Sequence, residues 1–335
     1  MYDYGIFIGR FQPFHNIHLE MLRKTLDQSK KVIVVVGSYN QARNVKNPWS
    51  GTERIAMIMN ALSEKERDRV VCLPVRDVLY NDNQWIAEVQ HEISEMIHEG
   101  ATVALFGHAT DSSSYYLKLF PQWDFVDTKV QSPTHASDLR RMYFTKDLAY
   151  KKSIPANVSS FITDFATTGA YDNLHDEYHH LCEYKDAWRG APFPPIFVTT
   201  DAVVVKSGHI LVVRRRGSPG KGLVALPGGF LQQEERIIDG CIRELKEETG
   251  IKMPASQLKD SVVENHVFDH PARSLRGRTI THAFCIDLGS GELPQVKGMD
   301  DADKSWWMAF HDVYGREDQF FDDHFHMIQY FIQRF

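Results

Sequence analysis

The chain has 335 residues, which at roughly 100–200 residues per domain suggests two domains. Hydrophobic residues make up 43% of it and charged residues 24%, as is ordinary for a soluble globular protein, and no apolar run approaches the ~18 residues of a membrane span. The net charge of −6 argues against a nucleic-acid partner, which usually needs a basic surface, so we interpret local Lys and Arg clusters as anion sites.

The cysteine pattern indicates a reducing compartment. The four cysteines are far apart and form no CxxC pair, so we expect reduced thiols and neither a disulfide framework nor a zinc site. The chain opens with no charged segment followed by an apolar signal region. We therefore predict a cytoplasmic protein with no membrane partner, and we leave a homo-oligomer open.

Strand and helix patterns alternate over the first half of the chain. Apolar runs predict strands at 4–9, 31–38, 70–75, 102–108 and 125–130, and helical periodicity predicts helices at 18–28, 50–67, 83–100 and 112–120. Ser50 or Thr52 caps the second helix, and Ser50 with Glu53 has the spacing of a capping box. This alternation predicts an α/β fold with a Rossmann-like, doubly wound parallel sheet.

The pattern changes after the middle of the chain. Residues 138 to about 185 look helical, and three prolines in APFPPIFVTTDAVVV then precede new strands. We place the boundary after residue 185, which gives domains at 1–185 and 186–335. The second domain has predicted strands at 196–205, 209–215, 262–268 and 278–287 and predicted helices at 234–249 and 320–334, which is an α+β pattern.

The stretch GRFQPFHNIH, residues 9–18, follows the first predicted strand. Ligands of parallel α/β sheets bind beyond the carboxyl ends of the strands, and the free N–H groups of a following helix favour phosphate. His15 and His18 are three residues apart, so both can point at one anion, and Arg140 and Arg141 add cations at a later helix start. A lone helix histidine is more often structural, but this combination favours a phosphate site.

These segments resemble the nucleotidyltransferase superfamily. GRFQPFHxxH resembles the motif (H/T)xGH, and THASDLR resembles (S)x(T)xxR, with Ser137 and Arg140 matching. NPWSGTERIAMI, YNDNQWIAEV and GHATDSSSYYLKLFPQW are similar to nicotinamide mononucleotide (NMN) adenylyltransferases of the archaeal type, over roughly residues 4–145. The resemblance implies NMN + ATP → NAD + pyrophosphate with Mg²⁺, a reaction that depends on positioning and charge neutralisation.

The resemblance also implies roles for single residues. His15, His18 and Arg140 are the predicted catalytic groups, which would neutralise the phosphates. Trp85 would stack on the nicotinamide ring, although it could equally fill the core, and Arg54 would bind the NMN phosphate unless it is a solvated helix arginine. The residues predicted to bind ATP or NMN are Gly9, Arg10, Phe11, Arg54, Trp85, Gly107, Asp111 and Ser137.

The stretch LPGGFLQQEERIIDGCIRELKEETGI, residues 226–251, carries the strongest pattern. Glu244, Glu247 and Glu248 share one helix face, where three like charges repel unless a divalent cation such as Mg²⁺ or Mn²⁺ binds them. Gly250 suits a helix C-cap. The stretch matches the Nudix box GX5EX7REUXEEXGU, whose fixed positions are here Gly229, Glu235, Arg243, Glu244, Leu245, Glu247, Glu248, Gly250 and Ile251.

The Nudix resemblance implies hydrolysis of a nucleoside diphosphate linked to another group, with metal ions that activate a water. Glu247 and Glu248 are the predicted catalytic residues, and with Glu244 they are the predicted metal ligands. HVFDHPARSLRGRTITHAFCI resembles ADP-ribose pyrophosphatases. The residues predicted to bind ADP-ribose are Gly229, Arg214, Arg273, Arg276 and Arg278, with Arg215 and Arg216 as further candidates; the arginines could equally form an exposed face. The general base is left open among Glu292, Asp300, Asp301 and Asp303.

The whole sequence resembles bacterial proteins that fuse the two enzymes. We therefore expect an NMN adenylyltransferase joined to an ADP-ribose pyrophosphatase, with Mg²⁺ or Mn²⁺ in both sites and ATP, NMN and ADP-ribose as small-molecule substrates. One alternative is a Nudix domain that senses ADP-ribose without hydrolysing it, although the intact box argues against that. Another keeps the folds but changes the substrates: a different phosphate acceptor, diadenosine polyphosphates or NADH.

Overall fold

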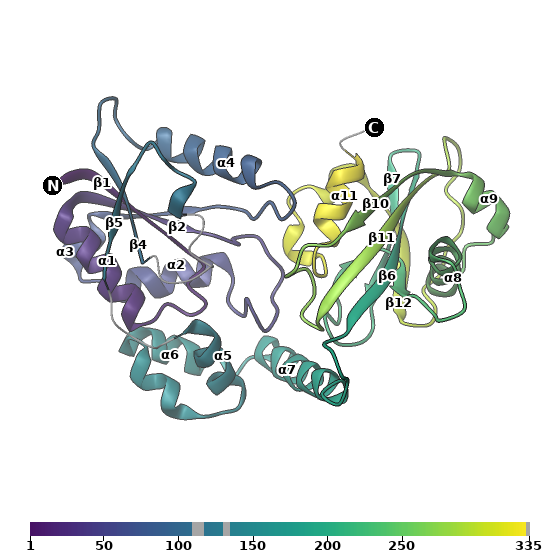
Figure 1. Cartoon of the computed structure of the whole chain (residues 1–335), viewed down its shortest axis with the longest axis horizontal. Coiled ribbons are helices and arrows are strands. Elements are labelled where there is room, and N and C mark those ends of the chain that lie inside the picture. Colours follow the sequence, from purple (N-terminus) through teal and green to yellow (C-terminus); the bar gives the residue numbers. More distant parts are fainter. Residues whose placement is uncertain (109–116, 130–134, 333–335) are drawn as a thin grey trace. The chain divides into compact units, whose positions relative to one another are not determined.

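A computed structural model describes residues 1–108, 117–129 and 135–332 of the chain (Figure 1). The chain divides into two compact units, Met1–His175 and Asp176–Phe335. The division falls within helix α7 (Gly169–Ala187), and our domain boundary after residue 185 stays a prediction.

The first unit contains a five-stranded sheet in the order β3-β2-β1-β4-β5. Every neighbouring pair in it is parallel, as predicted. The central strands are continuous apolar runs because both of their faces are covered, and Val32, Val34 and Val36 are fully buried. The strands are β1 (Tyr2–Gly9), β2 (Ser29–Val36), β3 (Val70–Pro74), β4 (Val103–Gly107) and β5 (Asp124–Asp127).

Helices cover both faces of this sheet (Figure 1). Helix α4 (Asp82–Ser94) packs Val89 and Ile93 against one face, while α1 (Asn16–Gln28) and α2 (Gly51–Asn60) lie on the other. The chain winds outward from β1 to β3 and then returns to β4, so the strand order reverses between β1 and β4. Their carboxyl ends, at Gly9 and Gly107, flank the point where such sheets bind ligands.

Two predicted helices are shorter than expected. The helix predicted over 50–67 is wrong as one element, because Ser63 starts a new helix, α3 (Glu64–Arg67), through a capping box with Glu66. Helix α4 ends at Ser94, before the predicted residue 100. The capping box of Ser50 and Glu53 is confirmed. Most of the helix predicted over 112–120 lies outside the described residues.

The predicted helical stretch after the sheet is confirmed. It contains α5 (Ala136–Phe144), η2 (Leu148–Ser153), α6 (Ala156–Phe165) and α7. Tyr143 of α5 ties this group together, because its hydroxyl donates to the carbonyl of Ile162 in α6 at 2.9 Å and its ring packs on Tyr171 of α7.

The second unit has a mixed sheet in the order β10-β11-β6-β7-β12, with β8 on β7 and β9 on β6. Only the pair of β11 and β6 is parallel among the pairs of this described sheet. The strands are β6 (Ile196–Lys206), β7 (His209–Arg215), β8 (Val224–Ala225), β9 (Gly228–Phe230), β10 (Val262–Phe268), β11 (Arg278–Asp287) and β12 (Ala302–Ala309).

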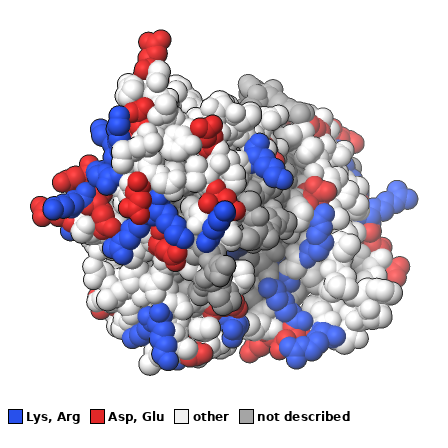
Figure 2. Space-filling view, turned by 60° about the vertical axis from the view of Figure 1, so that its left-hand side comes forward, with Lys and Arg blue, Asp and Glu red and all other residues white. Residues whose placement is uncertain are grey.

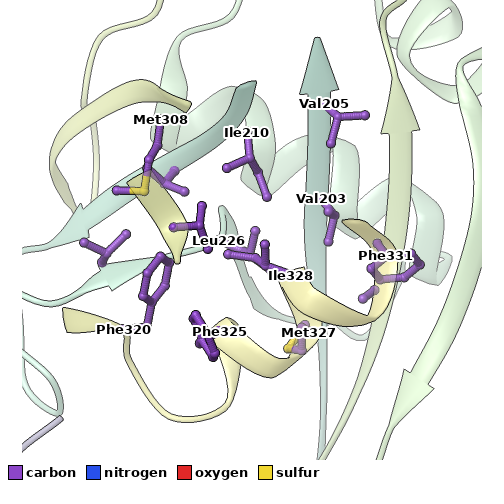
Figure 3. Close-up of a cluster of buried hydrophobic side chains, with 14 of the residues drawn as sticks. Val203, Val205, Ile210, Leu226, Met308, Phe320, Phe325, Met327, Ile328 and Phe331 are labelled. Carbon is purple, nitrogen blue, oxygen red and sulfur yellow. The ribbon is translucent and has the colours of Figure 1, made fainter. Parts of the chain in front are cut away.

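Alternating residues of β6 supply two cores. Ala202 and Val204 pack under α8 (Ile237–Thr249), whereas Val203 and Val205 face α11 (His324–Ile332), as Figure 3 shows for the second core. The α+β Nudix fold is thus as predicted. The smaller helices are α9 (Ala255–Asp260), α10 (Phe310–Val313) and η3 (Glu317–Gln319).

Strand β12 was missed by the sequence prediction. It is an edge strand that pairs only with β7 among the described strands, and polar residues such as Asp303 and Lys304 interrupt its apolar pattern. Asp303, one of the four candidates for the general base, lies in this strand.

Basic and acidic side chains are interspersed on the face of the molecule in Figure 2. Among the described residues visible there, no continuous basic stripe replaces this mixture. None of the described helices combines the length and apolar character that crossing a bilayer requires.

Candidate active sites

His15 and His18 stand at the start of α1, beyond the end of β1. His15 is the N-cap: its Nδ1 accepts from the N–H of His18 at 3.4 Å, and Nδ1 of His18 accepts from the N–H of His15 at 3.4 Å. The two rings are stacked, with centroids 3.6 Å apart. The pair therefore forms an imidazole version of a capping box, which fixes both rings on one side of the helix start.

The surroundings of these imidazoles are apolar. His15 is 5% exposed, and the ring of His18 packs among Phe7, Phe11 and Phe14. Burial, followed by the charge of His135, lowers the pKa of His15 to about 4, and burial followed by the charge of His15 holds the pKa of His18 well below its usual value.

Both imidazoles are thus neutral near pH 7, and our expectation that they neutralise phosphate charge needs correction. A neutral ring that accepts at Nδ1 carries its proton on Nε2. His15 can therefore donate a hydrogen bond from Nε2 to a phosphate oxygen without being charged.

The positive charge at this site comes from Arg10, Lys46 and Arg140. Burial and the charge of Arg10 lower the pKa of Arg140 to about 10. Burial and then the charges of Arg10 and Arg140 lower the pKa of Lys46, while Asp77 partly opposes this. Arg10 thus lies close enough to lower the pKa of both Lys46 and Arg140. Positive charge gathered in this way marks a place for an anion.

Our sequence prediction missed Lys46, because a single lysine in a loop carries no periodic or motif signal. The structure brings it to the site through a dense set of loop bonds. Asp77 accepts from the N–H and Oγ of Ser38 at 3.1 and 2.6 Å and from Gln41 at 2.9 Å. Oδ1 of Asn44 then accepts from the N–H of Lys46 at 2.9 Å.

Arg54 differs from its predicted role. Its side chain is 1% exposed, and its guanidinium donates to four backbone carbonyls, those of Ser50 (3.2 Å), Arg10 (2.7 Å), Gly37 (2.6 Å) and Ser38 (2.8 Å). These bonds join the ends of β1 and β2 to α2. We therefore interpret Arg54 as a positioning residue, because four of its five N–H donors bond to the backbone.

The remaining predicted nucleotide-binding residues fall into three groups. Gly9 and Gly107 end β1 and β4, and a Cβ on Gly9 would lie 2.8 Å from the ring of Phe11, so that turn needs glycine. Trp85 is half-buried against Phe120 and the core under α4, which fits packing as well as stacking. Ser137 is exposed on α5 beside Arg140, and Asp111 lies outside the described residues.

The Nudix box forms β9, a connecting loop and α8. Arg243 holds the box together: it donates to Glu235 through Nε (3.0 Å) and a terminal nitrogen (2.8 Å), and to Glu244 and Glu247 at 2.9 Å each. Arg243 and Glu235 thus form an ion pair within the box. Gly250 ends α8 in the left-handed conformation (φ 60°), as expected of a glycine C-cap.

Two box carboxylates are buried beside β9. Oε2 of Glu248 accepts from the N–H of Gly228 at 3.0 Å, and a Cβ on Gly229 would lie 2.4 Å from Oε1 of Glu244. Burial, with a contribution from the charges of Glu244 and Asp201, raises the pKa of Glu248 to about 8, and burial raises that of Glu244. Asp201 on β6 is a residue that the sequence prediction missed.

This arrangement fits a hard divalent cation. Burial raises the pKa of both carboxylates, so an added positive charge would stabilise their charged forms. Oxygen is the ligand atom that Mg²⁺ and Mn²⁺ prefer. In the described part of the chain, no three His, Cys, Asp or Glu side chains are already gathered in a metal-holding arrangement. The exposed carboxylate of Glu247 instead pairs with Arg243.

The predicted ADP-ribose arginines lie in different surroundings. Arg273 is 6% exposed and forms two bonds with the buried Asp323 at 2.8 and 2.9 Å, so it differs from the expected ligand role. Arg214 lies over the ring of Trp306, and Arg278 donates to the carbonyl of Asp269. Arg276 lies over Phe230, which directly follows Gly229.

The acidic candidates for the general base also lie in different surroundings. Asp303 pairs with Arg216 at 3.1 Å. The charge of Asp300 helps to raise the pKa of Glu244, and that of Asp301 reaches Arg215. Glu292 is exposed. Asp300 is thus the member of this set whose charge reaches a box glutamate, although no bond joins them among the described residues.

Comparison with known proteins gives two family matches, Cytidylyltransferase-like over residues 6–141 and NUDIX domain over residues 196–331. A Francisella tularensis crystal structure, a bifunctional NMN adenylyltransferase/ADP-ribose pyrophosphatase complexed with AMP and a manganese ion, is 36% identical, with a TM-score of 0.95 over 100% of this chain and 99% of that one. This chain belongs to that bifunctional family.

Two further relatives each match one part of the present chain. A nicotinamide/nicotinic acid mononucleotide adenylyltransferase of Acinetobacter baylyi is 36% identical over 53% of this chain and 94% of its own length. An ADP-ribose pyrophosphatase of Methanocaldococcus jannaschii is 37% identical over 31% of this chain and 57% of its own length.

The Arg54→Lys substitution tests the positioning role of that residue. One ammonium group cannot reach all four carbonyls, and each buried polar group left without a partner costs about 1–3 kcal/mol. We expect the free energy of unfolding of the first unit to fall by roughly 3 kcal/mol in urea titrations. The exposed Arg67→Lys is the control. Unchanged stability with a raised KM for NMN would instead support the phosphate role.

The pH dependence of His15 follows from its lowered pKa. Because its folded-state pKa of about 4 lies below the ordinary 6.5, His15 does not affect stability above pH 6.5 and weakens the fold as pH falls from 6.5 toward 4. NMR titration of the imidazole signals should give this midpoint, with His15→Asn, which keeps a capping side chain, identifying the signal. A midpoint near 6.5 would contradict the burial argument.

Proposed function

We propose that the first unit makes NAD by transferring the adenylyl group of ATP to NMN, with release of pyrophosphate, and that the second unit hydrolyses ADP-ribose to AMP and ribose 5-phosphate. Family membership supports both activities. The observation that carries the first is the meeting of Arg10, Lys46 and Arg140 at the strand switch point, and for the second it is the buried pair of Glu244 and Glu248.

In the first unit, catalysis needs no covalent protein nucleophile. The phosphate of NMN attacks the α-phosphorus of ATP, and negative charge spreads over the phosphate oxygens as pyrophosphate leaves. Arg10, Lys46 and Arg140 are suited to stabilise that charge, and Nε2–H of His15 to orient one oxygen. Arg140 is held for this by its bond to the carbonyl of Gln12 at 2.6 Å. Gly9, Arg10, Phe11, Gly107 and Ser137 remain the proposed nucleotide contacts.

In the second unit, Glu244 and Glu248, joined by Glu247, are the proposed ligands of Mg²⁺ or Mn²⁺. An ion held by these residues would polarise the diphosphate and lower the pKa of a water. The chain itself positions the carboxylates. Gly228 donates to Glu248, and Arg243 donates to Glu235 in the first part of the box. Arg276 and Arg215 are the proposed diphosphate contacts. Cytoplasmic location and homo-oligomerisation stay predictions from the sequence.

Product analysis of the purified chain tests both proposals. Incubation with NMN, ATP and Mg²⁺ should yield NAD and pyrophosphate, and incubation with ADP-ribose and Mg²⁺ or Mn²⁺ should yield AMP and ribose 5-phosphate. Binding of ADP-ribose without hydrolysis would favour a sensor. Faster turnover of diadenosine polyphosphates or NADH would change the proposed substrate while keeping the chemistry.

The Glu248→Gln substitution should separate the two activities. Its amide oxygen still accepts from Gly228, but the buried negative charge for the metal is lost. We expect pyrophosphatase kcat/KM to fall about 100-fold or more, with NAD synthesis unchanged. The exposed box residue Glu234→Gln is the matched control. Equal loss of both activities would show that the sites are not independent.

The Lys46→Met substitution tests the phosphate charge in the first unit. Methionine keeps the length of the side chain and removes a partly desolvated cation that two arginines repel. We expect KM for a phosphate-bearing substrate to rise about tenfold, because a charge-assisted phosphate contact is worth on the order of 1.5–3 kcal/mol, while thermal stability stays equal or rises. Lys31→Met, at an exposed position, is the control. A drop in stability with unchanged KM would assign Lys46 to structure.

A further inference from the structure

Two arginines lie over aromatic rings next to the Nudix box. The guanidinium carbon of Arg215, at the end of β7, is 4.1 Å from the ring centre of Phe321. That of Arg276 is 4.9 Å from the ring of Phe230 and 5.9 Å from the ring of Phe321. Both guanidinium groups therefore lie over the ring of Phe321, and burial, followed by the charge of Arg276, lowers the pKa of Arg215.

The ends of these two side chains are not used within the fold. Nε of Arg215 donates to the carbonyl of Pro219 at 2.9 Å, and Nε of Arg276 donates to Oγ of Ser274 at 3.4 Å. Within residues 1–108, 117–129 and 135–332, their terminal NH₂ groups form no hydrogen bond or ion pair. Each arginine thus has its planar end available for a ligand.

Asp322 directly follows Phe321, over whose ring the two arginines lie. Its carboxylate is half-buried and lies in the field of Arg276, Arg273 and Arg215, of which Arg273 is already paired with Asp323. Burial, more than the opposing charges, sets its pKa at about 7. Considering the described residues, no hydrogen-bond donor reaches this carboxylate. A carboxylate and two guanidinium groups therefore lie near one another, with no ion pair between them among the described residues.

The turn that carries Asp322 is held firmly. The N–H of Phe321 donates to the carbonyl of Val224 at 2.8 Å, and Nδ1 of His324 accepts from the N–H of Leu226 at 2.9 Å. A Cβ on Gly220 would lie 2.2 Å from the ring of Phe321, so this contact needs glycine. These bonds fix Asp322 relative to the segment that enters the Nudix box at Gly228.

The cluster also adjoins the carboxylates proposed to bind metal. The charge of Arg215 acts on Glu248, and Phe230 is the residue after Gly229 of the box. A diphosphate bound at the box thus lies within reach of Arg215 and Arg276. The group of a substrate that follows its diphosphate would then meet Asp322.

We propose that Asp322 determines specificity in the pyrophosphatase site, by accepting hydrogen bonds from the hydroxyl groups of a substrate ribose and by excluding a ribose that carries an extra phosphate. Arg215 and Arg276 donate to the diphosphate oxygens beside it. An unpaired carboxylate selects neutral O–H donors, as acidic residues do for the ribose hydroxyls at dinucleotide sites, and it repels an anion in the same place. The inference rests on the proposed pyrophosphatase function.

Two substitutions separate charge from hydrogen bonding. Asp322 has a left-handed backbone (φ 44°), a conformation that Asn and Gly adopt readily, so both variants keep the turn. Asp322→Asn keeps an accepting oxygen and removes the charge, whereas Asp322→Gly removes both. Asp318→Asn, an exposed position of the same segment, is the matched control.

The experiment compares kcat/KM for ADP-ribose with kcat/KM for ADP-ribose phosphorylated on the adenosine ribose or on the terminal ribose. We expect the full-length wild-type chain to prefer ADP-ribose at least tenfold over one of these analogues. Asp322→Asn should reduce that preference at least fivefold, and Asp322→Gly should also raise KM for ADP-ribose. Asp318→Asn should change neither.

A structural role for Asp322 would lower activity on all three substrates equally and leave the preference unchanged, which would overturn the inference while ADP-ribose hydrolysis by the wild type upholds the proposed function. A wild-type chain that does not hydrolyse ADP-ribose would overturn the proposed function, and this inference with it.

Discussion

Like charges held together away from water are the constraint on which both sites depend. In the first unit they are the cations Arg10, Lys46 and Arg140, and in the second the anions Glu244 and Glu248. Burial and crowding disfavour the charged forms, as the pKa of about 8 for Glu248 illustrates, so such groups depend on bonds from the fold to hold them in place. Backbone groups supply part of these bonds, from the carbonyl of Gln12 to the N–H of Gly228. An oppositely charged ligand supplies the rest, so binding and neutralisation are one event.

Local sequence patterns predicted the parts of the structure that local physics determines. The apolar runs gave the parallel strands because both faces of those strands are buried, and the Nudix box gave α8 because its glutamates and glycines have fixed spacing. The three-dimensional positions of single residues could not be predicted from local patterns. The positions of Lys46, Asp201 and Asp322 depend on bonds between distant segments, such as those from Ser38 to Asp77 and from Leu226 to His324, and no local periodicity signals such bonds. Edge strand β12 was missed for a related reason, because it buries one face only.

Residue type alone was also a poor guide to whether a side chain is charged and available for a ligand. Arg54 was expected to bind the NMN phosphate and Arg273 to bind ADP-ribose. In the structure Arg54 bonds to backbone carbonyls, and Arg273 forms a buried pair with Asp323. His15 and His18 were expected to be cationic, yet phenylalanine rings and low exposure keep them neutral. In each case burial decided the role, and burial is a property of the folded chain. Arg243 is the opposite case, because its partner Glu235 lies within the same short motif.

The reciprocal bonds between His15 and His18 have a consequence for how this chain can change over evolutionary time. The same two side chains begin α1 and lie at the proposed nucleotide site. Serine or asparagine would begin the helix equally well but would present no ring N–H, and a buried aromatic would fill the space but leave the helix start uncapped. A substitution at either position therefore affects the helix start and the proposed site together, so folding and catalysis select for the same pair of residues.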